Sequence, residues 1–124
     1  MKHLIILSVS GALGTLMRYG IITWIGTGTK GFPWATLSVN VIGSALMGVC
    51  YVLIIEKGVM PEAFRPYIMT AFLGALTTFS AFSLEMFQFI EGGQFLHAMI
   101  YTLASVLSCV LVLAASVWLV RHAV

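Results

Sequence analysis

The chain has 124 residues, of which 60% are hydrophobic and only 8% are charged, and its formal net charge is +2. A soluble domain carries about 25% charged residues, so this composition excludes an ordinary water-soluble enzyme. The few positive charges are also too dispersed to attract a nucleic acid. We therefore expect a protein embedded in a lipid bilayer.

Four long windows of the chain contain no Asp, Glu, Lys or Arg: residues 3–17, 31–55, 66–84 and 92–120. A bilayer-spanning helix needs roughly 20 predominantly apolar residues. The first window resembles a signal peptide, but the apolar run resumes after Arg18, which favours a retained span. We predict an all-α membrane protein with a single transmembrane domain over residues 1–124. Its spans are expected at about 4–25, 34–55, 67–90 and 96–120.

The loop charges give only a weak preference for one orientation in the membrane. The side with both termini and the 56–66 loop has four basic residues: Lys2, Lys57, Arg65 and Arg121. The other side has Lys30, and Arg18 if it reaches that far. This bias modestly favours cytoplasmic termini but leaves room for insertion in both orientations. Four helices can hardly enclose a pathway alone, so a symmetric dimer is the simplest expected assembly.

Each of the first three spans contains a polar side chain that is costly in lipid, and such residues are functional candidates. They are Arg18 in the first span, Asn40 in the second and Glu85 in the third. Because adjacent spans run in opposite directions, these three residues are expected at similar depth. One interpretation is an Arg18–Glu85 ion pair with Asn40 bridging two helices. The other is a water-filled vestibule with a cation at its base.

The middle of the third span is rich in hydroxyl groups. Thr77, Thr78, Ser80 and Ser83 follow Gly74 within a few residues. Consecutive threonines are poor helix formers, and their hydroxyls can replace backbone partners where a helix is interrupted. We therefore predict a break in the third span, which is tolerated at membrane depth where it lines a cavity. The alternative is that these hydroxyls bond back to their own helix.

Phe79 and Phe82 are three residues apart and so are neighbours on one helical face. Such a pair usually packs, but an aromatic ring also has a positive edge. Ring edges, hydroxyl protons and the Asn40 amide would together suit a small anion better than a cation. The two cysteines, Cys50 and Cys109, fall inside spans without a metal-binding spacing, so neither a disulfide nor a metal is assigned to them.

Three segments resemble the Fluc (CrcB) family of bacterial fluoride channels. They are Gly-Ala-Leu-Gly-Thr-Leu-Met-Arg-Tyr at 11–19, Thr-Leu-Ser-Val-Asn at 36–40, and Gly-Ala-Leu-Thr-Thr-Phe-Ser-Ala-Phe-Ser-Leu-Glu at 74–85. The resemblance covers all four spans. It implies an antiparallel, dual-topology homodimer with two fluoride pores in the bacterial plasma (inner) membrane.

The resemblance also implies roles for particular residues. Asn40 would donate a hydrogen bond to fluoride, and Phe79 and Phe82 would line the narrow pore with their ring edges. The backbone carbonyls of Gly74 and Thr77, from both subunits, would hold a structural Na⁺ at the two-fold axis. Arg18 would lie at the vestibule. Three residues would lie along the polar route: Thr36, Ser80 and Glu85.

Three positions depart from the family pattern: Ala81 between the two phenylalanines, and Cys109 and Leu113 in the fourth span, where hydroxyl residues are expected. Ser105 and Ser108 are taken as their substitutes on the polar route.

The function expected from the residues and the resemblance is passive export of fluoride from the cytoplasm, without enzymatic activity. The alternative transport function is a small four-span proton-coupled exporter of drugs or cations. That mechanism needs a titratable carboxylate at the centre of the pathway, typically in the first span, where this chain has Arg18. A non-transporting membrane scaffold would not need Asn40, the hydroxyl cluster and a break at one depth.

Overall fold

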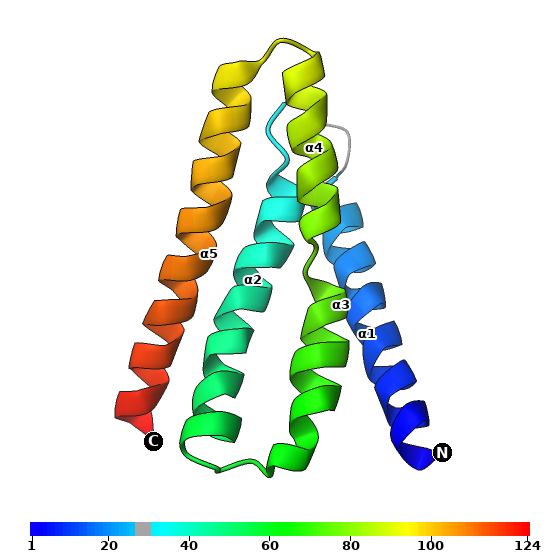
Figure 1. Cartoon of the computed structure of the whole chain (residues 1–124), viewed down its shortest axis with the longest axis vertical. Helices are drawn as coiled ribbons and strands as arrows, with labels where there is room; N and C mark the ends of the chain where they lie inside the picture. Colours follow the sequence, from blue (N-terminus) through cyan, green and yellow to red (C-terminus); the bar gives the residue numbers. More distant parts are fainter. Residues whose placement is uncertain (27–30) are drawn as a thin grey trace.

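The computed structural model describes residues 1–26 and 31–124. Four antiparallel helical crossings run along the long axis of the molecule (Figure 1). The first crossing is α1 (Lys2–Ile25) and the fourth is α5 (Phe95–Ala123). The second is α2 (Trp34–Cys50), extended by the π-helical segment η1 (Tyr51–Glu56). The third consists of four pieces: η2 (Glu62–Phe64), η3 (Pro66–Leu73), α3 (Gly74–Leu76) and α4 (Phe79–Glu91).

The crossings are long and apolar enough to span a bilayer, with mean hydropathies from 1.5 to 2.5 over their most apolar windows. Large apolar side chains cover the outside of the single chain, for example Leu13 on α1 and Leu107 on α5, each more than half exposed. Such a surface suits a lipid environment rather than water. The prediction of an all-helical protein with four membrane-spanning helices is confirmed.

Both termini and the connection between the second and third crossings lie at one end of the molecule (Figure 1). The four basic residues expected to share one side of the membrane are in these segments. Lys30, expected on the other side, lies outside the described residues.

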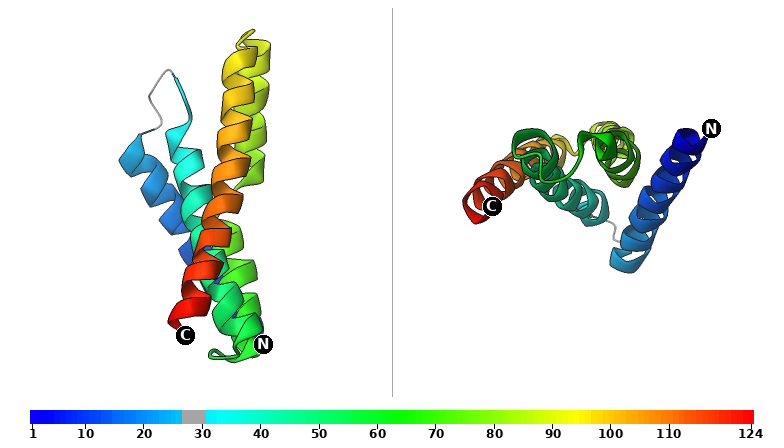
Figure 2. Two further views of the ribbon diagram at one scale, coloured as in Figure 1. Left: turned by 90° about the vertical axis from the view of Figure 1, so that its left-hand side faces the viewer. Right: turned by 90° about the horizontal axis from the view of Figure 1, so that it is seen from below.

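Glycines allow the crossings to approach closely. A Cβ atom at Gly14 of α1 would overlap the backbone carbonyl of Phe72 in the third crossing, and one at Gly48 of α2 would meet the carbonyl of Leu113 on α5. Small residues at such contacts let membrane helices pack backbone to backbone. Seen from below, α1 and α5 lie at opposite ends of the bundle, with the second and third crossings between them (Figure 2).

The third crossing is interrupted between α3 and α4, as the hydroxyl-rich sequence predicted. Thr77 (φ −85°, ψ 160°) and Thr78 (φ −151°, ψ 121°) are both extended. Thr78 then caps α4, because its Oγ1 accepts a hydrogen bond from the Ala81 N–H at 3.2 Å. The alternative expectation was that the hydroxyls bond back to their own helix, and this is observed for two residues. Thr77 donates to the Leu73 carbonyl and Ser83 donates to the Phe79 carbonyl.

Candidate functional site

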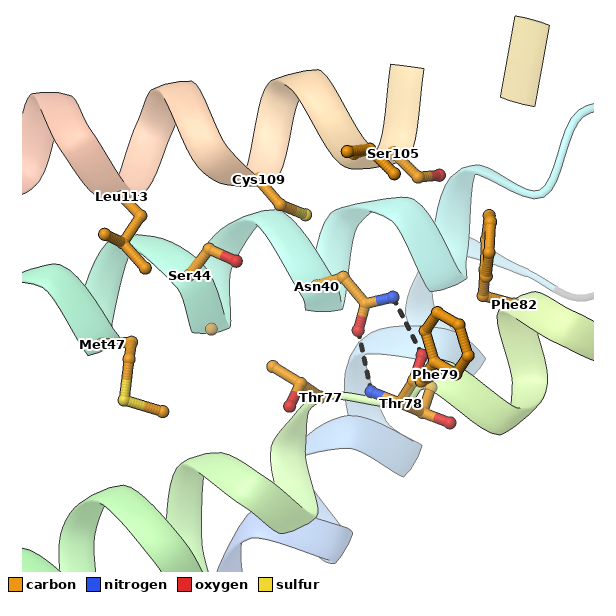
Figure 3. Close-up of a pocket in the computed structure, with 12 residues that line it drawn as sticks. Asn40, Ser44, Met47, Thr77, Thr78, Phe79, Phe82, Ser105, Cys109 and Leu113 are labelled. Atoms are coloured by element: carbon orange, nitrogen blue, oxygen red, sulfur yellow. Dashed lines mark hydrogen bonds between the residues drawn. The ribbon is translucent and has the colours of Figure 1, made fainter. Parts of the chain in front are cut away.

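One amide side chain from α2 stabilises the interruption. Asn40 Nδ2 donates to the Thr78 carbonyl at 3.0 Å, and the Thr78 N–H donates to Asn40 Oδ1 at 2.8 Å (Figure 3). In a continuous helix, the Thr78 N–H would pair with the Gly74 carbonyl four residues earlier. The Asn40 amide therefore substitutes for backbone partners, which polar groups at membrane depth require.

Arg18 lies beside the same break. Its Nη1 donates to the Thr77 carbonyl at 3.3 Å. The ion pair between Arg18 and Glu85, one of the two interpretations of the sequence, is wrong: within the described residues, the side-chain ion pairs join Arg65 to Glu62 and Arg121 to Glu56. The backbone carbonyl freed by the break offers Arg18 a closer acceptor than Glu85. The bridging of two helices by Asn40, which belonged to the same interpretation, is observed.

Glu85 is held by hydroxyl groups from two other helices. Thr36 Oγ1 donates to one of its carboxylate oxygens and the Tyr101 hydroxyl donates to the other, each at 2.6 Å. Both hydroxyl residues are buried in the single chain. Hydrogen bonds to an ionised group are stronger than neutral ones, so this three-helix contact links α2, α4 and α5 firmly.

Tyr101, which was not among the site residues predicted from the sequence, is fully buried and packs against Phe82 with ring centroids 5.1 Å apart. The sequence did contain an indication that Tyr101 belongs with the predicted site residues. It precedes Ser105 by four residues and so lies on the same face of α5.

A cavity of about 310 Å³ lies where α2, α5 and the broken third crossing meet (Figure 3). The two phenylalanines border it, with ring centroids 5.5 Å apart and ring planes inclined by 41°. Phe79 is 78% exposed although it sits at the break in the middle of the membrane-spanning region. The other lining residues are Asn40, Gly43, Ser44, Met47, Thr77, Thr78, Ser105, Val106, Cys109 and Leu113.

Five of the predicted site residues line this cavity: Asn40, Thr77, Phe79, Phe82 and Ser105. The Ser105 hydroxyl is buried and has no hydrogen-bond partner among the described residues. Ser80 lies at the edge of the break, 3.3 Å from the Thr78 hydroxyl. Ser108 instead lines a separate apolar groove between α2 and α5, and its hydroxyl is oriented toward the Ser105 carbonyl.

Cys109 and Leu113 both line the cavity. They are the two positions of the fourth span at which this sequence departs from the family pattern. They follow Ser105 at four-residue intervals on one face of α5. The cavity therefore has a polar end near the break and a less polar end toward Leu113 and Met47 (Figure 3).

The cavity offers hydrogen-bond donors without fixed negative charge. Its lining, as far as the chain is described, contains amide, hydroxyl, thiol and aromatic groups but no charged side chain. The nearby cation, Arg18, touches the break from the α1 side. The fold and the site together define a small multi-pass membrane protein whose third helix is interrupted around a donor-lined cavity.

Comparison with known proteins identifies the family. Residues 5–117 match the family model described as "CrcB-like protein, Camphor Resistance (CrcB)". The chain belongs to this family. It is 43% identical over 121 residues to the fluoride-specific ion channel FluC of Hahella chejuensis, covering 96% of this chain and 94% of that protein.

Two other relatives carry the same name. The protein from Geobacter metallireducens is 37% identical over 123 residues, covering 98% of this chain and 99% of that protein. The protein from Saccharophagus degradans is 48% identical over 100 residues, covering 80% and 74%. The resemblance based on the three sequence segments is thereby confirmed.

Proposed function

We propose that this protein is a fluoride-selective channel that lets fluoride leave the bacterial cytoplasm passively across the plasma membrane. The observation that carries the proposal is the donor-lined cavity at the break, where the Asn40 amide and two phenylalanine rings meet in a chain whose relatives are named fluoride channels. It acts as a transporter and not as an enzyme.

Fluoride must exchange its hydration shell for protein donors to enter a bilayer. Asn40 supplies such a donor. An amide nitrogen has two N–H groups, and among the described residues only one of them is hydrogen-bonded, to the Thr78 carbonyl. Because Thr78 holds the amide on both sides, the second N–H is oriented before the ion arrives.

The phenylalanine rings would add a contact to fluoride that is weaker than the hydrogen bond from Asn40 and that excludes water. A ring edge carries partial positive charge, so it attracts an anion, while the apolar ring excludes water. Phe79 and Phe82 lie one helical turn apart at the start of α4, immediately after the break. They thus border the cavity next to the Asn40 donor.

Beyond the phenylalanines, the Thr36–Glu85–Tyr101 contact continues the polar route. Both carboxylate oxygens of Glu85 accept hydrogen bonds, so Glu85 offers fluoride no donor. Its role is to orient the two hydroxyl groups that donate to it. Because Thr36 and Tyr101 each donate their one O–H to Glu85, the hydroxyls left to donate to fluoride in this region are those of Ser80 and Ser105.

The functional unit in this proposal is an antiparallel homodimer. Phe79 and two hydroxyl residues, Ser80 and Ser83, are exposed on the outside of the single chain near the break. Polar groups facing lipid are costly, so a second copy would cover this face. The weak charge bias of the loops suits insertion in both orientations, which an antiparallel pair requires.

The break also provides oxygen ligands that suit a structural Na⁺ ion. The Thr78 N–H, which would occupy the Gly74 carbonyl in a regular helix, pairs with Asn40. Gly74 is exposed on the surface of the single chain. Unwound carbonyls of this kind coordinate Na⁺ in membrane proteins. Gly74 and Thr77 from two copies would hold the ion at the centre of the dimer, with the Thr77 carbonyl using the lone pair that its hydrogen bond from Arg18 leaves free.

The experiment is ion efflux from liposomes that contain the purified protein. We expect rapid fluoride efflux and little chloride efflux. Equal efflux of both anions, or fluoride efflux only when coupled to a proton gradient, would exclude a selective passive channel.

The Phe82→Ile variant tests the phenylalanine pair in the same assay. We expect fluoride efflux to fall by about tenfold or more, because a lost ring contact of about 1.4 kcal/mol corresponds to a factor of ten. Phe87→Ile is the matched control, since Phe87 lies on the same helix, is 54% exposed and does not line the cavity. Unchanged efflux in Phe82→Ile would remove the pair from the pathway.

A further inference from the structure

Gly43 is a buried glycine of α2 that faces the break in the third crossing. A Cβ atom added at this position would lie 2.1 Å from Thr77 Cγ2, the methyl carbon of the first extended threonine. The next atoms are farther away, at 3.6 Å for Thr77 Cβ and 4.0 Å for Leu76 Cδ2. The methyl group of Thr77 therefore occupies the space that a side chain at position 43 would need.

Hydrogen bonds hold the polar groups of Thr77. Its N–H and its hydroxyl both donate to the Leu73 carbonyl at 3.0 Å. Its own carbonyl accepts a hydrogen bond from Arg18. A β-branched side chain has few accessible rotamers, so these contacts fix the direction of the methyl group as well. That methyl group is the part of Thr77 that enters the space beside Gly43.

Gly43 and Asn40 are three residues apart on α2, so they share one helical face. Asn40 exchanges two hydrogen bonds with the backbone of Thr78, and Gly43 leaves room for the side chain of Thr77 (Figure 3). One face of α2 therefore contacts both residues of the break, the first by shape and the second by hydrogen bonds. All four residues line the cavity.

We propose that Gly43 is a positioning residue for the fluoride pathway, because it sets where the break lies relative to Asn40. A contact of 2.1 Å is far shorter than the optimal carbon–carbon separation of about 3.5–4.0 Å, so a methyl group at position 43 would displace Thr77. The adjoining Thr78 would move with it. The Asn40 amide would then lose the two hydrogen bonds that orient its second N–H toward fluoride.

The first experiment is a double-mutant cycle between positions 43 and 77, measured as fluoride efflux from liposomes. We expect Gly43→Ala to slow efflux by at least about tenfold in the parent protein, because the added methyl group overpacks the break. Thr77→Ser removes the obstructing methyl group and leaves 3.6 Å to the nearest atom. In that background Gly43→Ala should slow efflux by less than about threefold. Equal losses in the two backgrounds would overturn the proposal.

Two further variants test whether this relief is specific. Thr77→Val keeps the methyl group and removes only the hydroxyl, so it should not relieve Gly43→Ala. Gly48→Ala is the matched control on the same helix, since its Cβ would meet the Leu113 carbonyl oxygen of α5 at 2.6 Å. Thr77→Ser should not relieve Gly48→Ala. Relief in either case would contradict a direct contact between positions 43 and 77.

Hydrogen exchange at the Thr78 amide distinguishes displacement of the break from a loss of cavity space. This N–H donates to Asn40, so its protection measures how closely the break approaches α2. By NMR of the purified protein in detergent, we expect about tenfold faster exchange in Gly43→Ala than in the parent protein. The double variant Gly43→Ala, Thr77→Ser should exchange at the parent rate. Slower efflux of Gly43→Ala with unchanged exchange would overturn the proposal.

The effect on efflux rests on the proposed fluoride channel, whereas the effect on exchange does not. The exchange result would stand even if the parent protein showed no fluoride efflux, which would instead overturn the proposed function. If Gly43→Ala alone does not fold, the double variant with Thr77→Ser should still fold and protect the Thr78 amide. Failure of the double variant to fold would overturn the proposal, because its nearest contact is an ordinary van der Waals distance.

Discussion

At the scale of single residues, the site contains few polar side chains within the membrane-spanning region. Asn40, Arg18 and Glu85 each have specific hydrogen-bond partners there. Asn40 replaces the backbone partners of Thr78, and Arg18 donates to the neighbouring Thr77 carbonyl. Glu85 accepts one hydrogen bond from a hydroxyl group on each carboxylate oxygen. Each polar side chain therefore compensates a group that would otherwise be costly to bury.

Tyr101→Phe tests the pairing of Glu85, because it removes one hydroxyl and keeps the buried ring. We expect fluoride efflux to fall by about tenfold, since a hydrogen bond to a charged group contributes about 1.5–3 kcal/mol. Tyr67→Phe is the control, because its hydroxyl contacts His3 at the exposed end of the bundle. Liposome efflux measures both variants, and equal rates in the two would show that the Glu85 contact does not serve transport.

At the scale of helices, the third crossing is the exceptional element. Two extended threonines separate α3, which ends the part before the break, from α4, which begins the part after it, and α2 carries the amide that binds Thr78. The crossing also needs close support from α1. Gly14 faces the carbonyl of Phe72, so the α1 backbone lies directly against the segment that precedes the break.

Gly14→Ala tests this contact. The added Cβ would overlap the Phe72 carbonyl oxygen and lie 3.1 Å from the Ala75 Cβ. We expect destabilisation of about 1–3 kcal/mol and a lower melting temperature in detergent. Gly20→Ala on the same helix meets no atom within 4 Å and should be neutral or slightly stabilising. If the two variants melted at the same temperature, the close approach of α1 would be contradicted.

At the scale of the whole molecule, the single chain exposes groups near the break that a bilayer does not favour. Its cavity is bordered by Phe79, which is largely exposed, and Gly74, Ser80 and Ser83 near the break are exposed as well. A bilayer penalises that arrangement, whereas a second copy would complete it. The proposed antiparallel homodimer would cover these exposed groups, and the weak charge bias of the loops leaves room for insertion in both orientations.

Dual topology is tested with single cysteines introduced at opposite ends of the bundle, in a Cys50→Ser, Cys109→Ser background. Val124→Cys marks the end with the termini, and Gly92→Cys marks the turn between α4 and α5. An impermeant thiol reagent added to intact cells should label about half of each variant if both orientations form equally. Complete labelling of one variant and none of the other would contradict an antiparallel dimer.

The sequence alone determined the membrane environment, the four spans and the break, because hydropathy and helix propensity are local properties that act along the chain. Motifs that resemble one family also singled out Asn40, Phe79 and Phe82, and all three line the cavity. Tertiary structure decided which polar groups meet. Arg18 pairs with a carbonyl rather than with Glu85, Tyr101 joins the site, and Ser108 faces away from the cavity. These outcomes depend on helix rotation and on distances between residues far apart in sequence, which composition and spacing do not specify.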